Sequence, residues 1–178
     1  MSEWPPRAIF PNRRKPHRLA PEEYRRVFQP VFFAACTKGR RPALLRDRLP
    51  RLFRALLHGN ARGNRCEIIA WVLMPDHVHV LACVVEGGGD VLRFFEGLKN
   101  GVANAALRAG IASLWQRDFW DRHTRNDLDL RRCVQYILRN PVEEGLCEGP
   151  AEWPHVEFRG YPWRQRPNTA NGNDRAGA

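Results

Sequence analysis

Two consecutive apolar runs in the middle of the chain constrain its fold more than any other feature. They are residues 66–74 (CEIIAWVLM) and residues 77–85 (HVHVLACVV), and only Pro75 and Asp76, a pair typical of turns, separate them. Short apolar runs bounded by turn residues are typical of buried strands. The sequence therefore predicts a β-hairpin at the centre of the fold.

Further elements are predicted on both sides of this hairpin. Apolar patterns indicate strands at 28–37 and 114–123, the second one short and irregular, and helices over 43–58, 90–108 and 126–140. The resulting order β-α-β-β-α-β-α matches an α+β fold of the ferredoxin-like type. Such a fold is expected to have an antiparallel sheet with its helices packed on one face.

Residues that start or stop helices set the expected helix ends. Asp90 is expected to cap the second helix, and either Asn126 or Asp127 the third. Pro50 is expected to kink or restart the first helix, and Pro141 to end the last one, because proline cannot donate the helical hydrogen bond.

The charge of the chain is high and unevenly distributed. The 178 residues carry a net charge of +10, and 26 of the 29 basic residues are arginines. Residues 1–65 hold 16 basic against 4 acidic residues, whereas residues 66–178 hold 13 against 15. A GC-rich genome could account for the preference for arginine over lysine, but not for this asymmetry. Because arginine binds phosphate with two hydrogen bonds, the composition predicts a nucleic-acid partner.

Composition also divides the chain. Residues 1–23 are expected to form a flexible arm rich in Pro and Arg, 24–163 a single domain, and 164–178 a disordered polar tail. The longest apolar run, Ile68 to Met74, is far shorter than the ~20 residues of a membrane-spanning helix. The five cysteines form no CxxC pair, which argues against a disulfide framework or a zinc ribbon and favours the cytoplasm.

Two histidines open the second strand of the predicted hairpin. His77 and His79 are two residues apart, so in a strand they point to the same face. Neutral imidazoles are good ligands for a divalent metal, and the pair is a candidate metal site. Taken alone, such a pair is more often a surface or core feature.

The last predicted helix carries a second group of polar residues. At 100° per residue, Tyr136, Asn140 and Arg132 fall together at the edge of the apolar stripe. There a tyrosine could attack a phosphate ester, Asn140 could bind a metal through its amide oxygen, and Arg132 or Arg139 could hold a phosphate. The alternative is a boundary tyrosine that only packs and donates a hydrogen bond.

Aromatic and basic residues between these two groups suit a nucleic acid. Trp115, Phe119 and Trp120 could stack on bases, although core packing explains them as well. The basic candidates for phosphate contacts, each of which could instead be a solvated charge, are Arg13, Arg14, Lys15, Arg25, Arg26, Lys38, Arg40, Arg41, Arg117, Arg122, Arg132 and Arg139.

Three blocks of sequence, in this order and spacing, resemble a known family. They are WVLMPDHVHVL (71–81), LWQRDFWDRHTRN (114–126) and VQYILRNPVEEGL (134–146). They are similar to the single-tyrosine HUH transposases, and among these to the REP-associated tyrosine transposases. The resemblance covers about residues 24–160 and implies an RRM-like or ferredoxin-like sheet.

The resemblance also implies a chemistry. His77, His79 and Asn140 would hold one Mg²⁺ or Mn²⁺, and Tyr136 would cleave single-stranded DNA beside imperfect hairpins through a 5′-phosphotyrosine link. Family members occur as monomers and as dimers, so a homodimer is an open expectation. Asp76 departs from the family, which more often has Asn there; its carboxylate could approach the metal or cap the turn.

Two other functions have to be weighed against DNA strand transfer. One is a domesticated hairpin-binding protein with a regulatory role, which the complete set of His77, His79, Tyr136 and Asn140 argues against. The other is an RNA-binding domain of the RRM type. That class stacks bases on aromatic residues of its central strands, and residues 77–84 contain none.

Overall fold

The sheet is the centre of the structure, a computed structural model that describes residues 18–162. Its five strands lie in the order β4-β1-β3-β2-β5, and every neighbouring pair is antiparallel. The strands are β1 (Val31–Cys36), β2 (Cys66–Leu73), β3 (His77–Val84), β4 (Trp120–His123) and β5 (Val156–Phe158), and the helices are α1 (Leu49–Gly63), α2 (Val91–Arg108) and α3 (Asp127–Glu143).

The predicted hairpin of β2 and β3 is confirmed. The amide of Met74 donates to the carbonyl of His77 across the turn, at 2.9 Å. Strand β3 lies between β1 and β2, and all eight of its residues are buried. The predicted order of elements is also confirmed, and β5 extends it by pairing with the outer side of β2.

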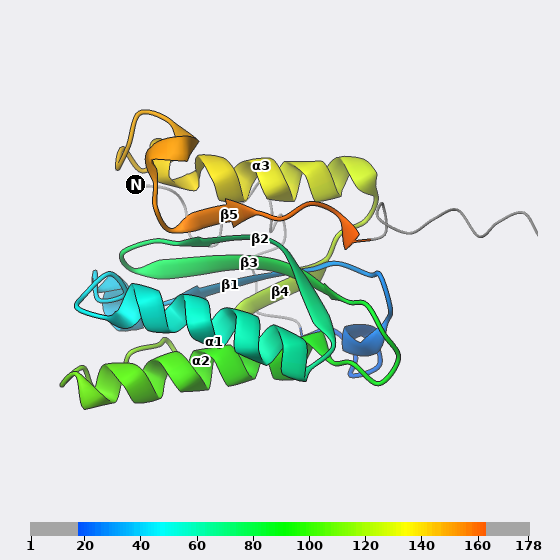
Figure 1. The fold of residues 1–178 in the computed structure, drawn as a ribbon, viewed down its shortest axis with the longest axis horizontal. Coiled ribbons are helices and arrows are strands. Elements are labelled where there is room, and N and C mark those ends of the chain that lie inside the picture. The colour runs from blue at the N-terminus through cyan, green and yellow to red at the C-terminus, as the bar shows by residue number, and fades with distance from the viewer. Residues whose placement is uncertain (1–17, 163–178) are drawn as a thin grey trace, which may run out of the picture.

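The α+β class is confirmed, but the expectation that the helices pack on one face is wrong. Helices α1 and α2 cover one face of the sheet, and α3 lies on the other (Figure 1). The reason is visible in β3, whose alternate residues enter two separate apolar clusters: Val78 and Val80 face α1 and α2, and Leu81 and Cys83 face α3. A strand that is apolar on both sides needs cover on both.

Helix α1 differs from its prediction at both ends. It begins at Leu49, so Pro50 stands in the first turn instead of kinking the helix. A proline there sacrifices no helical hydrogen bond, because the first amides have no partner within the helix. The helix also continues past Asn60 to Gly63, and the Asn60 side chain donates to the carbonyl of Leu56 at 2.8 Å.

Both predicted helix caps are confirmed, whereas the predicted end of α3 is wrong. The side chain of Asp90 accepts from two amides of α2, and that of Asn126 accepts from Asp129 N. Pro141 lies inside α3, two residues before its last residue, Glu143, and the missing proline amide removes one hydrogen bond of the helix. Asn140 and Pro141 still accept hydrogen bonds from following amides, at 3.1 and 2.8 Å, and Gly145 leaves the helix with φ +70°.

The described chain begins with a segment that contacts the sheet. Arg18 forms an ion pair with Asp121 at 3.1 Å, and the buried Tyr24 hydroxyl donates to the same carboxylate at 2.6 Å. Arg18 belongs to the segment 1–23 that is expected to form a flexible arm, whereas Tyr24 is the first residue of the expected domain. Residues 1–17 and 163–178 lie outside the described part, so the division into arm, domain and tail stays a prediction. Between residues 18 and 162, no helix is both long and apolar enough to cross a membrane.

Candidate active site

The two histidines of β3 lie on the α3 face of the sheet. Val78 between them enters the opposite core, and the imidazole ring centroids of His77 and His79 are 4.9 Å apart. Both side chains are buried. The strand alternation therefore places both rings on one side, as their spacing predicts.

Helix α3 brings a tyrosine and an asparagine against this pair. The ring of Tyr136 lies 5.1 Å from that of His79, and Asn140 Oδ1 lies 3.0 Å from His77 Nε2. Tyr136 is half-buried, whereas Asn140 is fully buried, deeper than its predicted position at the helix edge. Phe32 of β1 lies beneath both rings, 5.3 Å from His79 and 6.3 Å from Tyr136. Four residues from two elements thus meet at one point.

The arrangement fits a divalent cation. The Asp76 carboxylate can only accept, so His77 carries a proton on Nδ1, 2.7 Å from Asp76 Oδ1. Unless His77 holds a second proton, its Nε2 and Asn140 Oδ1 then present lone pairs to each other at 3.0 Å. Adjacent ligands of an octahedral ion with bonds of about 2.1 Å stand about 3 Å apart. Within residues 18–162 no group of three His, Cys, Asp or Glu could hold a metal, and the polar side chain that accompanies the two histidines is the amide of Asn140.

Asp76 is directed away from this point, toward Arg40. Its second carboxylate oxygen lies 2.8 Å from Arg40 Nε, and Arg40 also donates to Cys36 Sγ. The carbonyl of Asp76 accepts from the Thr37 amide at 2.8 Å. The turn before β3 is therefore held by the segment after β1, and the Asp76 carboxylate supports His77 from behind.

Burial and nearby charges shift the acidity of the site. Burial, followed by the neighbouring His77 and Arg40, holds the pKa of His79 well below its usual value, so the ring is neutral. Burial and the carboxylates of Glu143 and Glu144 raise the pKa of Tyr136, while Asn140 and Arg40 lower it. Without a further cation, the phenol is protonated at neutral pH.

Comparison with known proteins decides the family. A family model described as IS200-like transposase matches residues 30–140, a range that includes both histidines and ends at Asn140. The chain belongs to the IS200-like transposases. A REP-associated tyrosine transposase of Escherichia coli (strain K12) is 32% identical over 139 residues, which cover 76% of this chain and 82% of that protein. The transposase is therefore an enzyme of the REP-associated tyrosine type.

A solved structure supports the same assignment at the level of the fold. It is the structure of a REP-associated tyrosine transposase bound to a REP hairpin, with a TM-score of 0.67 and 29% sequence identity. The match covers 80% of this transposase and 81% of that chain. The sheet and the helices on both of its faces are thus those of a known DNA-bound relative.

The predicted phosphate contacts of the transposase lie in several environments. Arg122 is half-buried, and its two Nη atoms donate to Asp129 at 2.7 and 2.9 Å, so its guanidinium is occupied. Arg40 is held by Asp76, as described above. Arg13, Arg14 and Lys15 lie outside the described residues. The exposed candidates are Arg25, Arg26, Lys38, Arg41, Arg117, Arg132 and Arg139.

The three aromatic residues of block 114–126, which were candidates for stacking on bases, do not form one surface. Phe119 is buried and Trp115 packs beside it on the α1 and α2 face, where the Trp115 indole donates to the carbonyl of Lys99 at 2.9 Å. Trp120 packs against the apolar cluster on the α3 face. Strand alternation separates neighbours 119 and 120, so of the three only Trp120 shares a sheet face with Tyr136.

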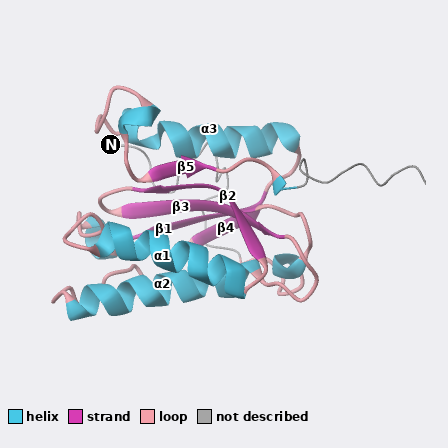
Figure 2. Ribbon diagram, in the orientation of Figure 1, coloured by secondary structure: helices cyan, strands magenta, loops and turns pink. Residues whose placement is uncertain are grey.

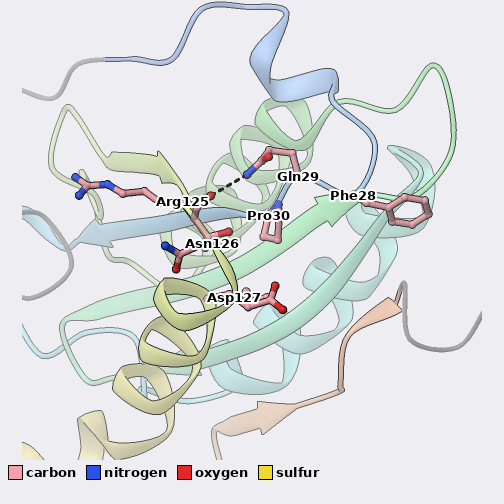
Figure 3. A pocket seen from close by; sticks show the side chains of 8 residues that line it. Phe28, Gln29, Pro30, Arg125, Asn126 and Asp127 are labelled. Carbon is pink, nitrogen blue, oxygen red and sulfur yellow. Dashed lines mark hydrogen bonds between the residues drawn. The ribbon is translucent and has the colours of Figure 1, made fainter.

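A surface pocket of about 260 Å³ lies at the start of α3 (Figure 3). Figure 3 shows Gln29 donating to the carbonyl of Thr124 beside Asn126 and Asp127. This end of the sheet is where β1 begins, whereas Cys36 at the other end of β1 pairs with His77. Six strand residues span about 17 Å. The lining of the pocket includes none of His77, His79, Tyr136 and Asn140, so it is not the site of these residues.

The sequence did not connect Asp76 and Arg40 with the support of His77, and it did not single out Phe32. The support of His77 by Asp76 and Arg40 depends on a contact between segments 36 residues apart, which no local pattern reveals. The sheet face of Phe32 could have been predicted, because alternate residues of a strand point to opposite faces. Nothing in the sequence, however, indicated that the ring would lie under His79.

Proposed function

We propose that this transposase cleaves and rejoins single-stranded DNA through a covalent bond between Tyr136 and a 5′ phosphate. The observation that carries the proposal is the position of Tyr136: its ring lies against His79, and Asn140, one helical turn later, reaches His77. A nucleophile beside three candidate metal ligands is an arrangement suited to phosphoryl transfer through a covalent intermediate.

The proposed reaction exchanges one ester for another. The Tyr136 oxygen attacks the scissile phosphorus, a Tyr–O–P bond forms, and the P–O3′ bond breaks. The leaving 3′ oxygen takes up a proton and becomes a hydroxyl. In the reverse step a 3′ hydroxyl attacks the phosphotyrosine and releases the phenolate. Because each step replaces one phosphodiester by another, rejoining needs no ATP.

Deprotonation of Tyr136 is the step that the surroundings of the site control. Burial and the two glutamates at the end of α3 oppose the phenolate, and Arg40 and Asn140 favour it. His77, His79 and Asn140 would hold Mg²⁺ or Mn²⁺. When bound, the ion would polarise the phosphoryl oxygens and stabilise the charge that develops on them.

The proposed substrate is DNA that contains imperfect hairpins. This proposal is supported by the relative of known structure, which is 29% identical in sequence to this chain and is bound to a REP hairpin. The charge of +10 is compatible with a polyanionic ligand. A homodimer stays a prediction, and the molecular mass of the protein–DNA complex in solution tests it.

A covalent-capture experiment tests the proposal. A hairpin oligonucleotide with single-stranded flanks, labelled at its 3′ end, is incubated with the protein and Mn²⁺, and the products are separated under denaturing conditions. A labelled protein–DNA adduct is expected for the natural chain and for Tyr161→Phe, and none for Tyr136→Phe. The three tyrosines of the chain make this control possible.

Two outcomes would contradict the proposal. An adduct that survives Tyr136→Phe would remove this tyrosine from the reaction. Tight binding of the hairpin without any adduct, over a range of flanking sequences and with either metal, would favour the alternative of a hairpin-binding regulator.

A further inference from the structure

Helix α1 carries a row of three arginines and one histidine on the side of the molecule away from Tyr136. Arg51, Arg54, His58 and Arg62 fall within an arc of about 80° when plotted at 100° per residue. The three arginines are exposed and His58 is half-buried. The helix contains no aspartate or glutamate. Its outward face is therefore purely basic.

A pocket of about 530 Å³ continues this row at the C-terminal end of α1. It is lined by His58, Arg62 and the beginning of β2, and Arg159, which follows β5, closes it from the other side. Residues almost 100 positions apart in the sequence thus add a further guanidinium to the row. We call Arg51, Arg54, His58, Arg62 and Arg159 the α1 basic stripe.

Few acidic groups oppose the α1 basic stripe. Glu157 of β5 lies 3.4 Å from both Arg54 and Arg159, and it also accepts a hydrogen bond from the indole of Trp71 at 3.1 Å. Glu67 lines the pocket as well. Four arginines against two glutamates leave a net positive surface whose guanidinium groups are largely exposed.

His58 lies among the arginines of the stripe, and its pKa responds to their charge. Burial, followed by the guanidinium groups of Arg159, Arg54 and Arg62, lowers the pKa of His58, and only Glu157 opposes them. A positive potential is thus present at the rim of the pocket. A phosphate bound there would reverse the effect and raise the pKa of His58.

We propose that the α1 basic stripe binds the phosphate backbone of the double-stranded stem of a DNA hairpin. The helix rises about 17 Å over the 11 steps from Arg51 to Arg62. Phosphates of one strand of a duplex follow each other at about 3.4 Å along the axis, so this length matches about five of them. The proposal rests on the proposed function, because it takes DNA as the substrate.

The stripe suits a duplex better than a single strand. Single-stranded DNA is bound by aromatic rings that stack on its bases, and the exposed positions of α1 hold only Arg, Leu, Ala and Gly. Its position is also informative, because α1 and α3 lie on opposite faces of the sheet (Figure 2). Holding the stem is therefore spatially separate from cleavage at Tyr136.

Paired charge variants test the proposal. Arg54→Gln with Arg62→Gln removes two charges from the stripe, and Arg93→Gln with Arg108→Gln removes two from the neighbouring α2. All four side chains are exposed, so unchanged thermal unfolding is expected for both variants. Binding is measured with a hairpin and with a strand of equal length that cannot pair with itself, at several salt concentrations.

The stripe variant is expected to bind the hairpin about tenfold more weakly and to lose about 2 from the slope of log K against log salt. Its affinity for the unpaired strand and its yield of Tyr136 adduct at saturating DNA should stay unchanged. The α2 variant should change hairpin affinity less than about twofold. Equal losses in the two variants, or none in the stripe variant, would overturn the proposal.

A titration of His58 by NMR gives a second measurement. The groups that face it are Arg54, Arg62, Arg159 and Glu157, so addition of hairpin should raise the pKa of His58 against this fixed background. An unchanged pKa in a saturated complex would place the stem elsewhere. Hairpin binding through the stripe without any Tyr136 adduct would refute the proposed cleavage and leave the stripe intact.

Discussion

The two faces of the sheet are built differently, although the same strands supply both. The face under α1 and α2 is an apolar core with large rings, among them Phe33, Phe95 and Trp71. The face under α3 has a smaller apolar cluster, and beside it lie the buried polar side chains of His77, His79 and Asn140.

This difference shows how one sheet can serve both stability and chemistry. Burying polar groups costs free energy unless they are well paired, so a polar site weakens the face on which it lies. Strand alternation keeps that cost away from the other face, where Val78, between the two histidines, and Val80, after His79, pack into the apolar core. The four predictions that follow alter one face at a time.

The largest effect is expected for Tyr136→Phe on the α3 face. Loss of the nucleophile should lower DNA cleavage by at least about a thousandfold, because no other tyrosine lies against His79. The phenol oxygen is not part of a core, so the free energy of unfolding should change by less than about 1 kcal/mol. Cleavage assays and urea denaturation on the same sample measure both. A large loss of stability would mean that the two faces are not independent.

The opposite behaviour is expected for Phe95→Ala in the other core. The Phe95 ring is fully buried, stacks on Phe33 with centroids 4.4 Å apart and meets Phe119 at 5.0 Å. Its removal should destabilise the protein by about 3–5 kcal/mol. The rate of cleavage per folded molecule should remain that of the natural chain. A rate that falls with the stability, at temperatures where the variant is folded, would couple the two faces.

A smaller effect is expected where the support of His77 is removed. Asp76→Ala deletes the carboxylate that holds the Nδ1 proton of His77. Groups that orient a metal-binding histidine typically change metal affinity by about 10–100-fold when removed. Calorimetric titration with Mn²⁺ in the absence of DNA measures this, and Asp118→Ala, an exposed position, serves as control. Equal affinities of the two variants would show that His77 needs no such support.

The smallest effect concerns Lys99, a buried charge beside the larger core. Burial and the nearby Arg18 lower its pKa to about 8, against Asp118 and Glu96, which raise it. Between pH 8 and about 10.5, Lys99 is therefore protonated in the unfolded chain and largely deprotonated in the folded chain. The free energy of unfolding consequently increases as the pH rises through this range. Lys99→Met should stabilise the protein by about 2 kcal/mol at pH 7, and the gain should vanish near pH 10.5. Denaturation at both values measures it, and an equal gain at both would exclude the charge as its cause.

Much of the local structure could be predicted because it depends on residues close in sequence. The hairpin follows from two apolar runs and a turn, and the Asp90 and Asn126 caps follow from side chains that reach amides two or three residues away. The shared face of His77 and His79 follows from the geometry of a strand. The helical spacing of four likewise groups Tyr136 with Asn140.

Errors occurred where packing outweighed a local tendency. Pro141 was expected to end α3, yet the helix runs on to Glu143; Asn140 and Pro141 are themselves buried against the sheet, and their carbonyls still accept hydrogen bonds from later amides. Pro50 was expected to kink or restart a helix over 43–58, and the helix in fact starts beside it, at Leu49, so the predicted start at residue 43 is wrong. The prediction that all helices pack on one face of the sheet was wrong for a related reason. The pattern in β3 specifies that both faces of the strand are apolar, but it does not say which helix covers each face.

By itself, the sequence determined the elements, their order, the family and the residues from which a site could be made. The tertiary structure alone decided that Asn140 meets His77, that Asp76 and Arg40 stand behind that histidine, and that Arg159 joins the arginines of α1. The physical reason is range. Periodicity and capping act over a few residues, whereas these contacts join segments 36 to about 100 residues apart, which only the folded sheet brings together.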